Sequence, residues 1–369
     1  MIQLPSQDPF YDPAPVRGLP GDPIRVRRVA LPLQERCRAW QVVYQSTGVL
    51  GRPVAMSGTL LVPASPAAGS GDRPVLAYGV GVHGLGRDAA PSHLLRVGTE
   101  PEQPAIEAAL ARGWVVVVPD GEGLGMPGPH TYGAGEPGGH ALLDLVRAAR
   151  VLTPEASTAS PVLLWGYSEG GRCAAFAAES AALYAPELDV VAVAAGGVPA
   201  DLRAVARAIG QGPFAGLALA VLIGLATAYD DDRLWHILTE EGRKTARRAA
   251  DCDVVGLVLE HGRPLTELTV REEPWDSPRW REVLSRELAG TRAPSAPAYL
   301  YHCGDDEIVP VPVGRALASA WIARGGEVTW SDVDAESHLA GGLAGMPDAL
   351  AWLSARLETR SSFEARLAR

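Results

Sequence analysis

A serine framed by two glycines is the strongest chemical signal in this chain. Ser168 is the centre of a G-x-S-x-G motif at 166–170, directly after the apolar run 161–165. Glycines in such a motif remove Cβ atoms that would clash in a tight turn between a strand and a helix, so the serine hydroxyl can stand exposed at the apex. The helix that follows directs free N–H groups toward the serine. We therefore predict that Ser168 is a nucleophile and that the Glu169 amide is one donor to an oxyanion.

The pentapeptide alone is a moderate signal, because a chain with 41 glycines can contain G-x-S-x-G in a surface turn. A serine nucleophile also needs a base, and the base needs an acid that orients it. After this motif the expected order along the chain is serine, acid, histidine. We predict that His338 is the base, in a mobile glycine-rich loop at 335–342, and that Asp306 is the acid, with Asp305 as the alternative.

A second oxyanion donor is expected from the glycine-rich segment 79–86. Its glycines allow close approach of the backbone to a substrate, and the amides of His83, Gly84 and Leu85 would join that of Glu169. The His83 side chain either contributes to this site or only lines the pocket. Four side chains are expected to contact the substrate, because they flank the nucleophile, form the loop 120–139 or belong to the apolar segment 214–229: Tyr167, Leu124, Phe214 and Leu217.

Composition limits the classes of partner. The chain has 369 residues, a formal net charge of −10 and no long basic run, so nucleic acid is not expected as a partner. The longest apolar stretch, 214–228, is too short for a transmembrane helix. The four cysteines lie far apart without C-x-x-C spacing, so we expect no structural metal and no cofactor. The first 20 residues do not have the pattern of a signal peptide. The oligomeric state is not predicted.

The order of the expected elements predicts an α/β fold with a mostly parallel central sheet and helices on both faces. Strand and helix patterns alternate up to residue 199 and again from residue 293. The segment 200–292 between them reads as mostly helical, which predicts a lid inserted at the carboxyl edge of the sheet. We therefore expect a core of 1–199 and 293–369, in which the proline-rich segment 1–35 wraps the surface.

Several motifs together resemble the secretory lipases similar to yeast lipase A, within the α/β-hydrolases. They occur over most of the chain, at 8–11 (DPFY), 83–86 (HGLG), 122–125 (EGLG), 130–132 (HTY), 166–171 (GYSEGG), 184–188 (YAPEL), 196–202 (GGVPADL) and 306–310 (DEIVP). The resemblance implies the α/β-hydrolase fold, a triad of Ser168, Asp306 and His338, a helical lid and hydrolysis of acyl esters, including lipids.

The chain also departs from this family. Ala89-Ala90 and Ile322 stand where members usually have cysteines, so family disulfides are expected to be missing. This favours a cytoplasmic protein over a secreted one. The alternative is a secreted protein from which a signal peptide has been removed. Gly121 replaces a tyrosine that is common in the family, which implies an altered pocket wall.

The sequence as a whole predicts a serine carboxylic-ester hydrolase (esterase or lipase) that acts on a small-molecule or lipid ester. Two alternatives stay open. One is an acyltransferase or cyclase that uses the same triad. The other is a non-catalytic binding protein that keeps the hydrolase fold.

Overall fold

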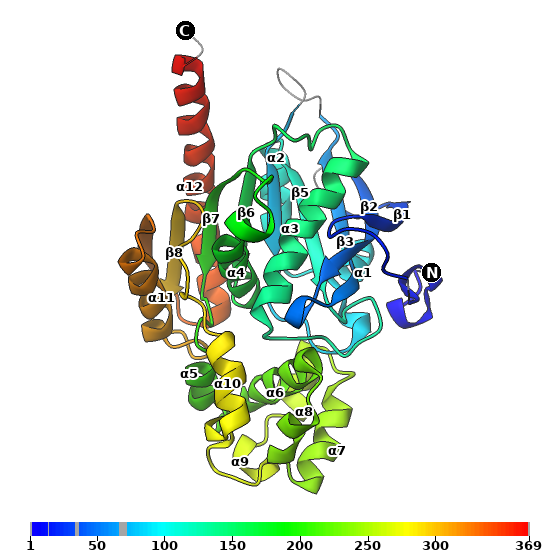
Figure 1. Cartoon of the computed structure of the whole chain (residues 1–369), viewed down its shortest axis with the longest axis vertical. Coiled ribbons are helices and arrows are strands. Elements are labelled where there is room, and N and C mark those ends of the chain that lie inside the picture. Colours follow the sequence, from blue (N-terminus) through cyan, green and yellow to red (C-terminus); the bar gives the residue numbers. More distant parts are fainter. Residues whose placement is uncertain (1, 14, 34–36, 66–71, 368–369) are drawn as a thin grey trace.

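A nine-stranded sheet forms the centre of the molecule (Figure 1). The computed structural model describes residues 2–13, 15–33, 37–65 and 72–367. The sheet has the strand order β1-β2-β3-β5-β4-β6-β7-β8-β9. The strands are β1 (Pro23–Val29), β2 (Cys37–Thr47), β3 (Pro53–Pro63), β4 (Val75–Gly79), β5 (Val115–Gly121), β6 (Val162–Tyr167), β7 (Val190–Gly196), β8 (Ala298–Cys303) and β9 (Val328–Val333). Pairings from β1 to β3 and between β3 and β5 are antiparallel, and all others are parallel. The predicted α/β class with a mostly parallel sheet is confirmed.

Helices cover both faces of this sheet (Figure 1). The helices of the described residues are α1 (Pro91–Val97), α2 (Gln103–Ala111), α3 (Gly135–Leu152), α4 (Glu169–Tyr184), α5 (Leu202–Ile209), α6 (Ala215–Tyr229), α7 (Glu240–Ala249), α8 (Val254–Glu260), α9 (Leu265–Leu268), α10 (Pro278–Arg286), α11 (Val311–Ala323) and α12 (His338–Leu367). Of these, α5 to α10 lie away from the sheet (Figure 1). Short 3-10 turns lie at η1 (Pro5–Gln7), η2 (Pro9–Tyr11), η3 (Val49–Gly51), η4 (Arg87–Ala89), η5 (Asp232–Ile237) and η6 (Pro274–Asp276).

Alternation along the central strands divides the core into two layers. In β6, Leu164 packs with α3 and α4, whereas its neighbours Leu163 and Trp165 pack with α1, α2 and α12 on the opposite face. Successive side chains of a strand point to opposite faces, so a strand covered on both faces must be apolar throughout. This is why the predicted strands of the core read as unbroken apolar runs.

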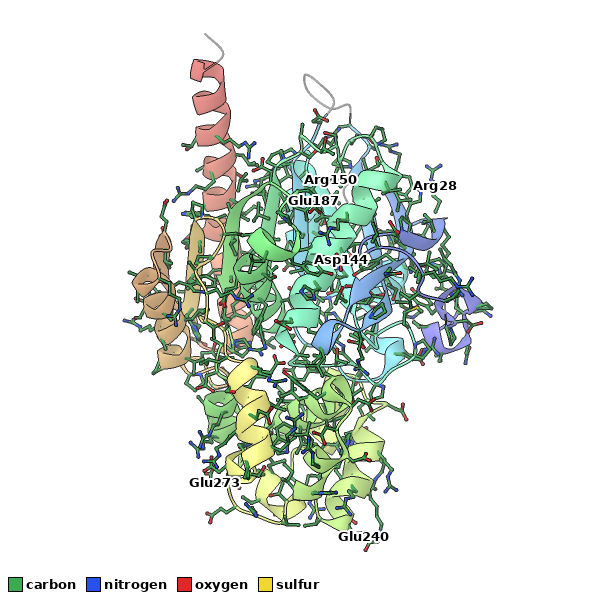
Figure 2. All side chains as sticks on the ribbon, viewed as in Figure 1. Arg28, Asp144, Arg150, Glu187, Glu240 and Glu273 are labelled. Atoms are coloured by element: carbon green, nitrogen blue, oxygen red, sulfur yellow. The ribbon has the colours of Figure 1, made fainter. Side chains whose placement is uncertain are left out.

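Six helices, α5 to α10, leave the core between β7 and β8 and gather at one end of the molecule (Figure 1). We call this segment, residues 200–292, the cap. Its central helix α6 is buried on nearly all sides, as its uniform apolarity requires. The far end of the cap is polar: Glu240 pairs with Lys244 and Glu273 with Arg207 (Figure 2).

Two elements differ from the sequence expectation. The segment 1–35, expected to wrap the surface, contains the edge strand β1, which has no apolar face for the sequence to show because Arg25 and Arg27 occupy half-buried positions and Val26 is exposed. Residues 1, 14, 34 and 35 of that segment lie outside the described part. The last helix begins at His338, inside the segment 335–342 that was expected to be a loop. Within the described ranges, no helix is both long and apolar enough to cross a membrane.

Candidate active site

Ser168 lies at the turn between β6 and α4 with φ 55° and ψ −121°, a conformation that L-residues rarely adopt. The turn exists because its glycines allow backbone contact. A Cβ on Gly170 would lie 1.9 Å from the carbonyl oxygen of Gly79, and one on Gly166 would lie 2.3 Å from the carbonyl of Gly170. This strained strand-turn-helix geometry is that of a nucleophile elbow. Ser168 is half-buried there.

The imidazole of His338 bridges the serine and an acid. Its Nε2 atom lies 2.8 Å from Ser168 Oγ, and its Nδ1 atom lies 2.7 Å from Asp306 Oδ2. The structure therefore brings together the three side chains that the sequence nominated for a triad. Asp305, the alternative acid, is exposed, whereas the Asp306 side chain is fully buried.

Asp306 is held as a carboxylate by the groups around it. Its Oδ1 atom accepts hydrogen bonds from the amides of Ile308 and Val309, at 3.0 and 2.6 Å. Burial raises the pKa of Asp306, but hydrogen bonds from His302 and His338 outweigh burial and hold this pKa well below its ordinary value. Asp306 can therefore only accept the Nδ1 proton of His338, which fixes the tautomer that leaves Nε2 free to accept a proton from Ser168.

The loop predicted at 335–342 is wrong from residue 338 onward, because helix α12 begins there. His338 is 2% exposed and is the first residue of α12. The glycines after it serve packing: a Cβ on Gly341 would lie 2.6 Å from Cys303 Cβ, and one on Gly342 would lie 2.9 Å from the Tyr167 ring. They let the first turn of the helix approach the core closely. The His338 amide donates to Glu307 Oε2 at 2.7 Å.

Two of the amides predicted as oxyanion donors, those of Glu169 and His83, are placed so that they could bind an oxyanion beside Ser168. The Glu169 amide lies at the first position of α4, where N–H groups have no partner within the helix. The segment that follows β4 also comes close to the nucleophile, since a Cβ on Gly81 would lie 4.0 Å from Ser168 Cβ. Within the described residues, the amides of Val82 and His83 have no hydrogen-bond partner, so they are free to donate.

Leu85 does not fit its predicted role. Its amide donates to the carbonyl of Cys252 in the cap at 2.9 Å, and Leu85 itself is fully buried. Gly84 is paired with Asp253 of the cap by an isolated β-bridge. In this conformation the cap therefore occupies one of the amides that the sequence assigned to the substrate oxyanion, that of Leu85, and leaves the His83 and Glu169 amides free.

The His83 ring also has partners away from the serine. Its Nε2 atom lies 2.9 Å from Glu100 Oε2, and its Nδ1 atom lies 2.7 Å from the Gly81 carbonyl. Burial lowers the pKa of His83, but the Glu100 carboxylate outweighs it and raises this pKa to about 9. Both nitrogens then carry protons and donate. The side chain orders the segment 81–83, and we find no free nitrogen for the substrate.

Neither of two cavities, one beside the nucleophile turn and one between α6 and α7, is lined by all four residues expected to contact substrate. The Tyr167 hydroxyl donates to the His338 carbonyl at 2.7 Å. Leu124 lines a small cavity of about 50 Å³ together with Glu122, His130 and Glu169, which has room for one or two water molecules. Phe214 and Leu217 line neither this cavity nor a second one of about 370 Å³ between α6 and α7. Contact of these side chains with substrate stays a prediction.

The His130 ring lies beside Gly121, where the family commonly has a tyrosine. Gly121 has φ +89°, and a Cβ there would lie 2.8 Å from the His130 ring. His130 therefore fills space that a larger side chain would need. Burial lowers the pKa of His130 to about 4, so the ring is neutral at pH 7.

Sequence reasoning assigned no catalytic role to two residues that contact the nominated triad. His302 is buried beneath the acid, and its Nε2 atom lies 3.2 Å from Asp306 Oδ2. The Glu307 carboxylate accepts a hydrogen bond from the His338 amide. The four-residue spacing from His302 to Asp306, across the end of β8, is the only signal that could have suggested the first contact.

The fold and the Ser-His-Asp geometry are those of an α/β-hydrolase. Residues 89–365 match the family described as "Secretory lipase", and the chain belongs to that family. It is 32% identical to a probable inactive lipase of Mycobacterium tuberculosis, over 96% of this chain and 82% of that protein. It is 27% identical to lipase A of Arthroderma benhamiae, over 96% and 80%.

Solved structures show the same fold. Candida antarctica lipase A in its closed state superposes with a TM-score of 0.87 at 25% identity, over 97% of this chain and 87% of that one. The rice cell wall degrading esterase LipA of Xanthomonas oryzae has a TM-score of 0.76 at 20% identity, over 90% and 97%. The predicted family is thereby confirmed.

Proposed function

We propose that this chain is a serine carboxylic-ester hydrolase whose triad is Ser168, His338 and Asp306. The observation that carries the proposal is the position of the His338 ring, with one nitrogen 2.8 Å from Ser168 Oγ and the other 2.7 Å from Asp306 Oδ2. Membership of the secretory lipase family supports ester substrates.

The proposed reaction begins when Ser168 Oγ attacks the ester carbonyl and His338 Nε2 takes the hydroxyl proton. The tetrahedral oxyanion accepts hydrogen bonds from the Glu169 amide and from the free amides of the segment 82–83. His338 then gives its proton to the leaving alcohol, and an acyl-serine forms. A water molecule, deprotonated by His338, attacks the acyl-serine and releases the carboxylic acid. Asp306 stays ionised and stabilises the imidazolium in both steps.

We further propose that the cap is a lid over this site. Cys252 and Val254 in the cap are hydrogen-bonded to Leu85, Gly86 and His83, beside the nucleophile. Similarity to the closed state of Candida antarctica lipase A supports a closed conformation. Release of these contacts would free the Leu85 amide and admit an ester. Rates over esters of different acyl length will distinguish a small-molecule ester from a lipid ester as the substrate.

Replacing Ser168 by alanine tests the triad. We expect Ser168→Ala to lose hydrolysis of p-nitrophenyl esters by about 10⁴-fold or more. Ser180→Ala, on the same helix α4, is the matched control: the Ser180 hydroxyl bonds only to backbone carbonyls of its own helix. Activity retained in folded Ser168→Ala would reject the proposal. A rate profile from acetate to long-chain esters then separates esterase from lipase.

A second candidate is a non-catalytic protein with the hydrolase fold. Its specific support is the 32% identity to a protein named a probable inactive lipase. Labelling with a fluorophosphonate distinguishes the two, since an active serine reacts covalently and an inert one does not. The acyltransferase or cyclase alternative is tested by product analysis with an added alcohol or amine, because transfer yields the new ester or amide in place of free acid.

A further inference from the structure

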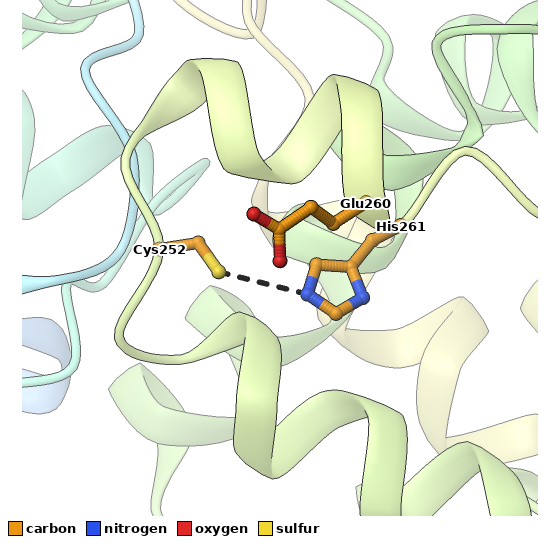
Figure 3. A group of neighbouring side chains, drawn as sticks. All are labelled: Cys252, Glu260 and His261. Carbon is orange, nitrogen blue, oxygen red and sulfur yellow. Dashed lines mark hydrogen bonds between the residues drawn. The ribbon is translucent and has the colours of Figure 1, made fainter.

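A thiol, an imidazole and a carboxylate meet in the cap, away from the triad (Figure 3). Cys252 lies between α7 and α8, and Glu260 and His261 lie at the end of α8. One ligand atom of each side chain lies within 4.8 Å of the others. His261 is buried, Cys252 is half-buried and Glu260 is exposed. We propose that Cys252, Glu260 and His261 bind a zinc ion.

The distances suit zinc. Cys252 Sγ lies 3.6 Å from His261 Nε2. In a tetrahedral site with Zn–S of about 2.3 Å and Zn–N of about 2.0–2.1 Å, these two ligand atoms stand about 3.6 Å apart. The exposed Glu260 side chain is free to move the remaining distance, and water would complete the fourth position. Thiolate and imidazole together select zinc over calcium or magnesium, which take oxygen ligands. On binding, the Cys252 thiol loses its proton to solvent.

The ion would join the two ends of α8. Cys252 precedes the N-cap of this seven-residue helix, and Glu260 and His261 close it. A short helix is marginally stable by itself, so a link between its ends stabilises it. Helix α8 also packs on α6, where a Cβ on Gly216 would lie 1.8 Å from the Leu257 carbonyl oxygen. Zinc at this place would stiffen the cap next to its central helix.

The same residue contacts the core beside the nucleophile. The Cys252 carbonyl accepts hydrogen bonds from Leu85 at 2.9 Å and Gly86 at 3.0 Å, and the Val254 amide donates to His83 at 2.8 Å. A ligand that fixes Cys252 therefore fixes the backbone that holds the cap on the segment 83–86. We infer that zinc stabilises the cap in its docked position.

The test uses the full chain, reduced, freed of metal with a chelator and titrated with cobalt(II) chloride. We expect a thiolate-to-cobalt charge-transfer band and the visible bands of tetrahedral cobalt. All of these bands should disappear when zinc chloride displaces the cobalt. Cys252→Ser should lose the charge-transfer band. Since removal of a residue that merely supports a ligand costs about 10–100-fold in metal affinity, His261→Asn should bind zinc at least about 100-fold more weakly. Cys37→Ser and His236→Ala, outside the cluster, should match wild type.

Glu260→Gln separates loss of a metal ligand from loss of folding, because an exposed carboxylate contributes little to stability. We expect its zinc affinity to fall by about tenfold or more. Zinc should also raise the thermal unfolding temperature of wild type and leave that of Cys252→Ser unchanged. A wild-type chain without the charge-transfer band, or a Cys252→Ser variant that keeps it, would overturn the site. The probe is the metal alone, so the outcome does not depend on ester hydrolysis.

Discussion

The Nε2 atom of His302 lies 3.2 Å from Oδ2 of Asp306, the same oxygen that accepts the hydrogen bond from His338. The same ring nitrogen lies 2.9 Å from the Val309 carbonyl, so one N–H is shared between a carbonyl and the carboxylate. His302 is fully surrounded by the core, 1% exposed. If the proposed triad is active, His302 is expected to act as a positioning residue, because it contacts the acid and is buried away from solvent.

We expect His302→Leu to lower kcat for p-nitrophenyl esters by about tenfold, equivalent to about 1.4 kcal/mol, with little change in KM. The reason is that Asp306 loses a donor and is less well oriented toward His338. A partial rescue in His302→Gln, which restores an N–H group, would mark the effect as positioning. A His302→Leu variant with wild-type kcat would show that the contact is dispensable.

Substitution of Tyr167 can distinguish a role in binding substrate from a role in holding His338. The sequence placed it in the substrate pocket, whereas its hydroxyl donates to the His338 carbonyl and its ring centroid lies 5.0 Å from that of His338. We expect Tyr167→Phe to lose about 1 kcal/mol of stability and to lower kcat a few-fold, with KM unchanged. Steady-state kinetics over a range of ester concentrations measures both constants. A raised KM with unchanged kcat would instead support the role in substrate binding.

The His83–Glu100 pair makes folding stability depend on pH. The pKa of His83 is raised to about 9 in the folded chain, above its ordinary value of 6.5. A raised pKa means that the stabilisation is complete below pH 6.5 and is lost as the pH rises through about 9. This loss is on the order of 3 kcal/mol. Urea unfolding at pH 6, 7.5, 9 and 10 measures it.

Glu100→Gln is the matched variant for that measurement. It removes the carboxylate that raises the His83 pKa, so its unfolding free energy should vary much less over the same pH range. Equal pH dependence in the variant and wild type would assign the effect to other groups.

A buried ion pair ties the elbow helix to the cap. Arg172 Nη2 lies 2.9 Å from Glu287 Oε2, and both side chains are almost fully buried. Glu287 also accepts from the Tyr229 hydroxyl of α6 at 2.9 Å and from the Gly135 amide at 2.7 Å. We expect Glu287→Ala to lower the free energy of unfolding by about 3–5 kcal/mol, because it leaves the buried Arg172 charge without a carboxylate, with only the backbone carbonyls of residues 133, 199 and 287 as partners.

The control for this variant is Glu273→Ala, which breaks the half-exposed pair with Arg207 on the cap surface (Figure 2). Exposed pairs contribute about 0–1 kcal/mol, so its effect should be small. Urea unfolding of both variants measures the difference. Similar small losses would mean that the buried arginine is satisfied by its carbonyl partners alone.

Local patterns were sufficient to predict the central strands of the sheet, though not the edge strand β1, and to nominate the triad. The apolar runs at β4 to β8 predict buried parallel strands because both faces of each strand are covered. The glycines at 166 and 170 predict the elbow because only they permit the backbone contact with Gly79. The chain order of serine, acid and histidine then left few candidates for the other two positions. These features depend on neighbours in sequence or on the period of a strand.

Features that depend on contact between distant segments came only from the tertiary structure. The glycines after His338 looked like a mobile loop. The side chains that fill the space beside Gly341 belong to Tyr167 and Cys303, which lie 174 and 38 positions earlier, so the sequence could not show this close packing. In the same way, Leu85 was a reasonable oxyanion donor until the cap placed the Cys252 carbonyl on its amide. Sequence determined which chemical groups are present and in which elements they lie; packing across the chain decided which of their hydrogen bonds are already used.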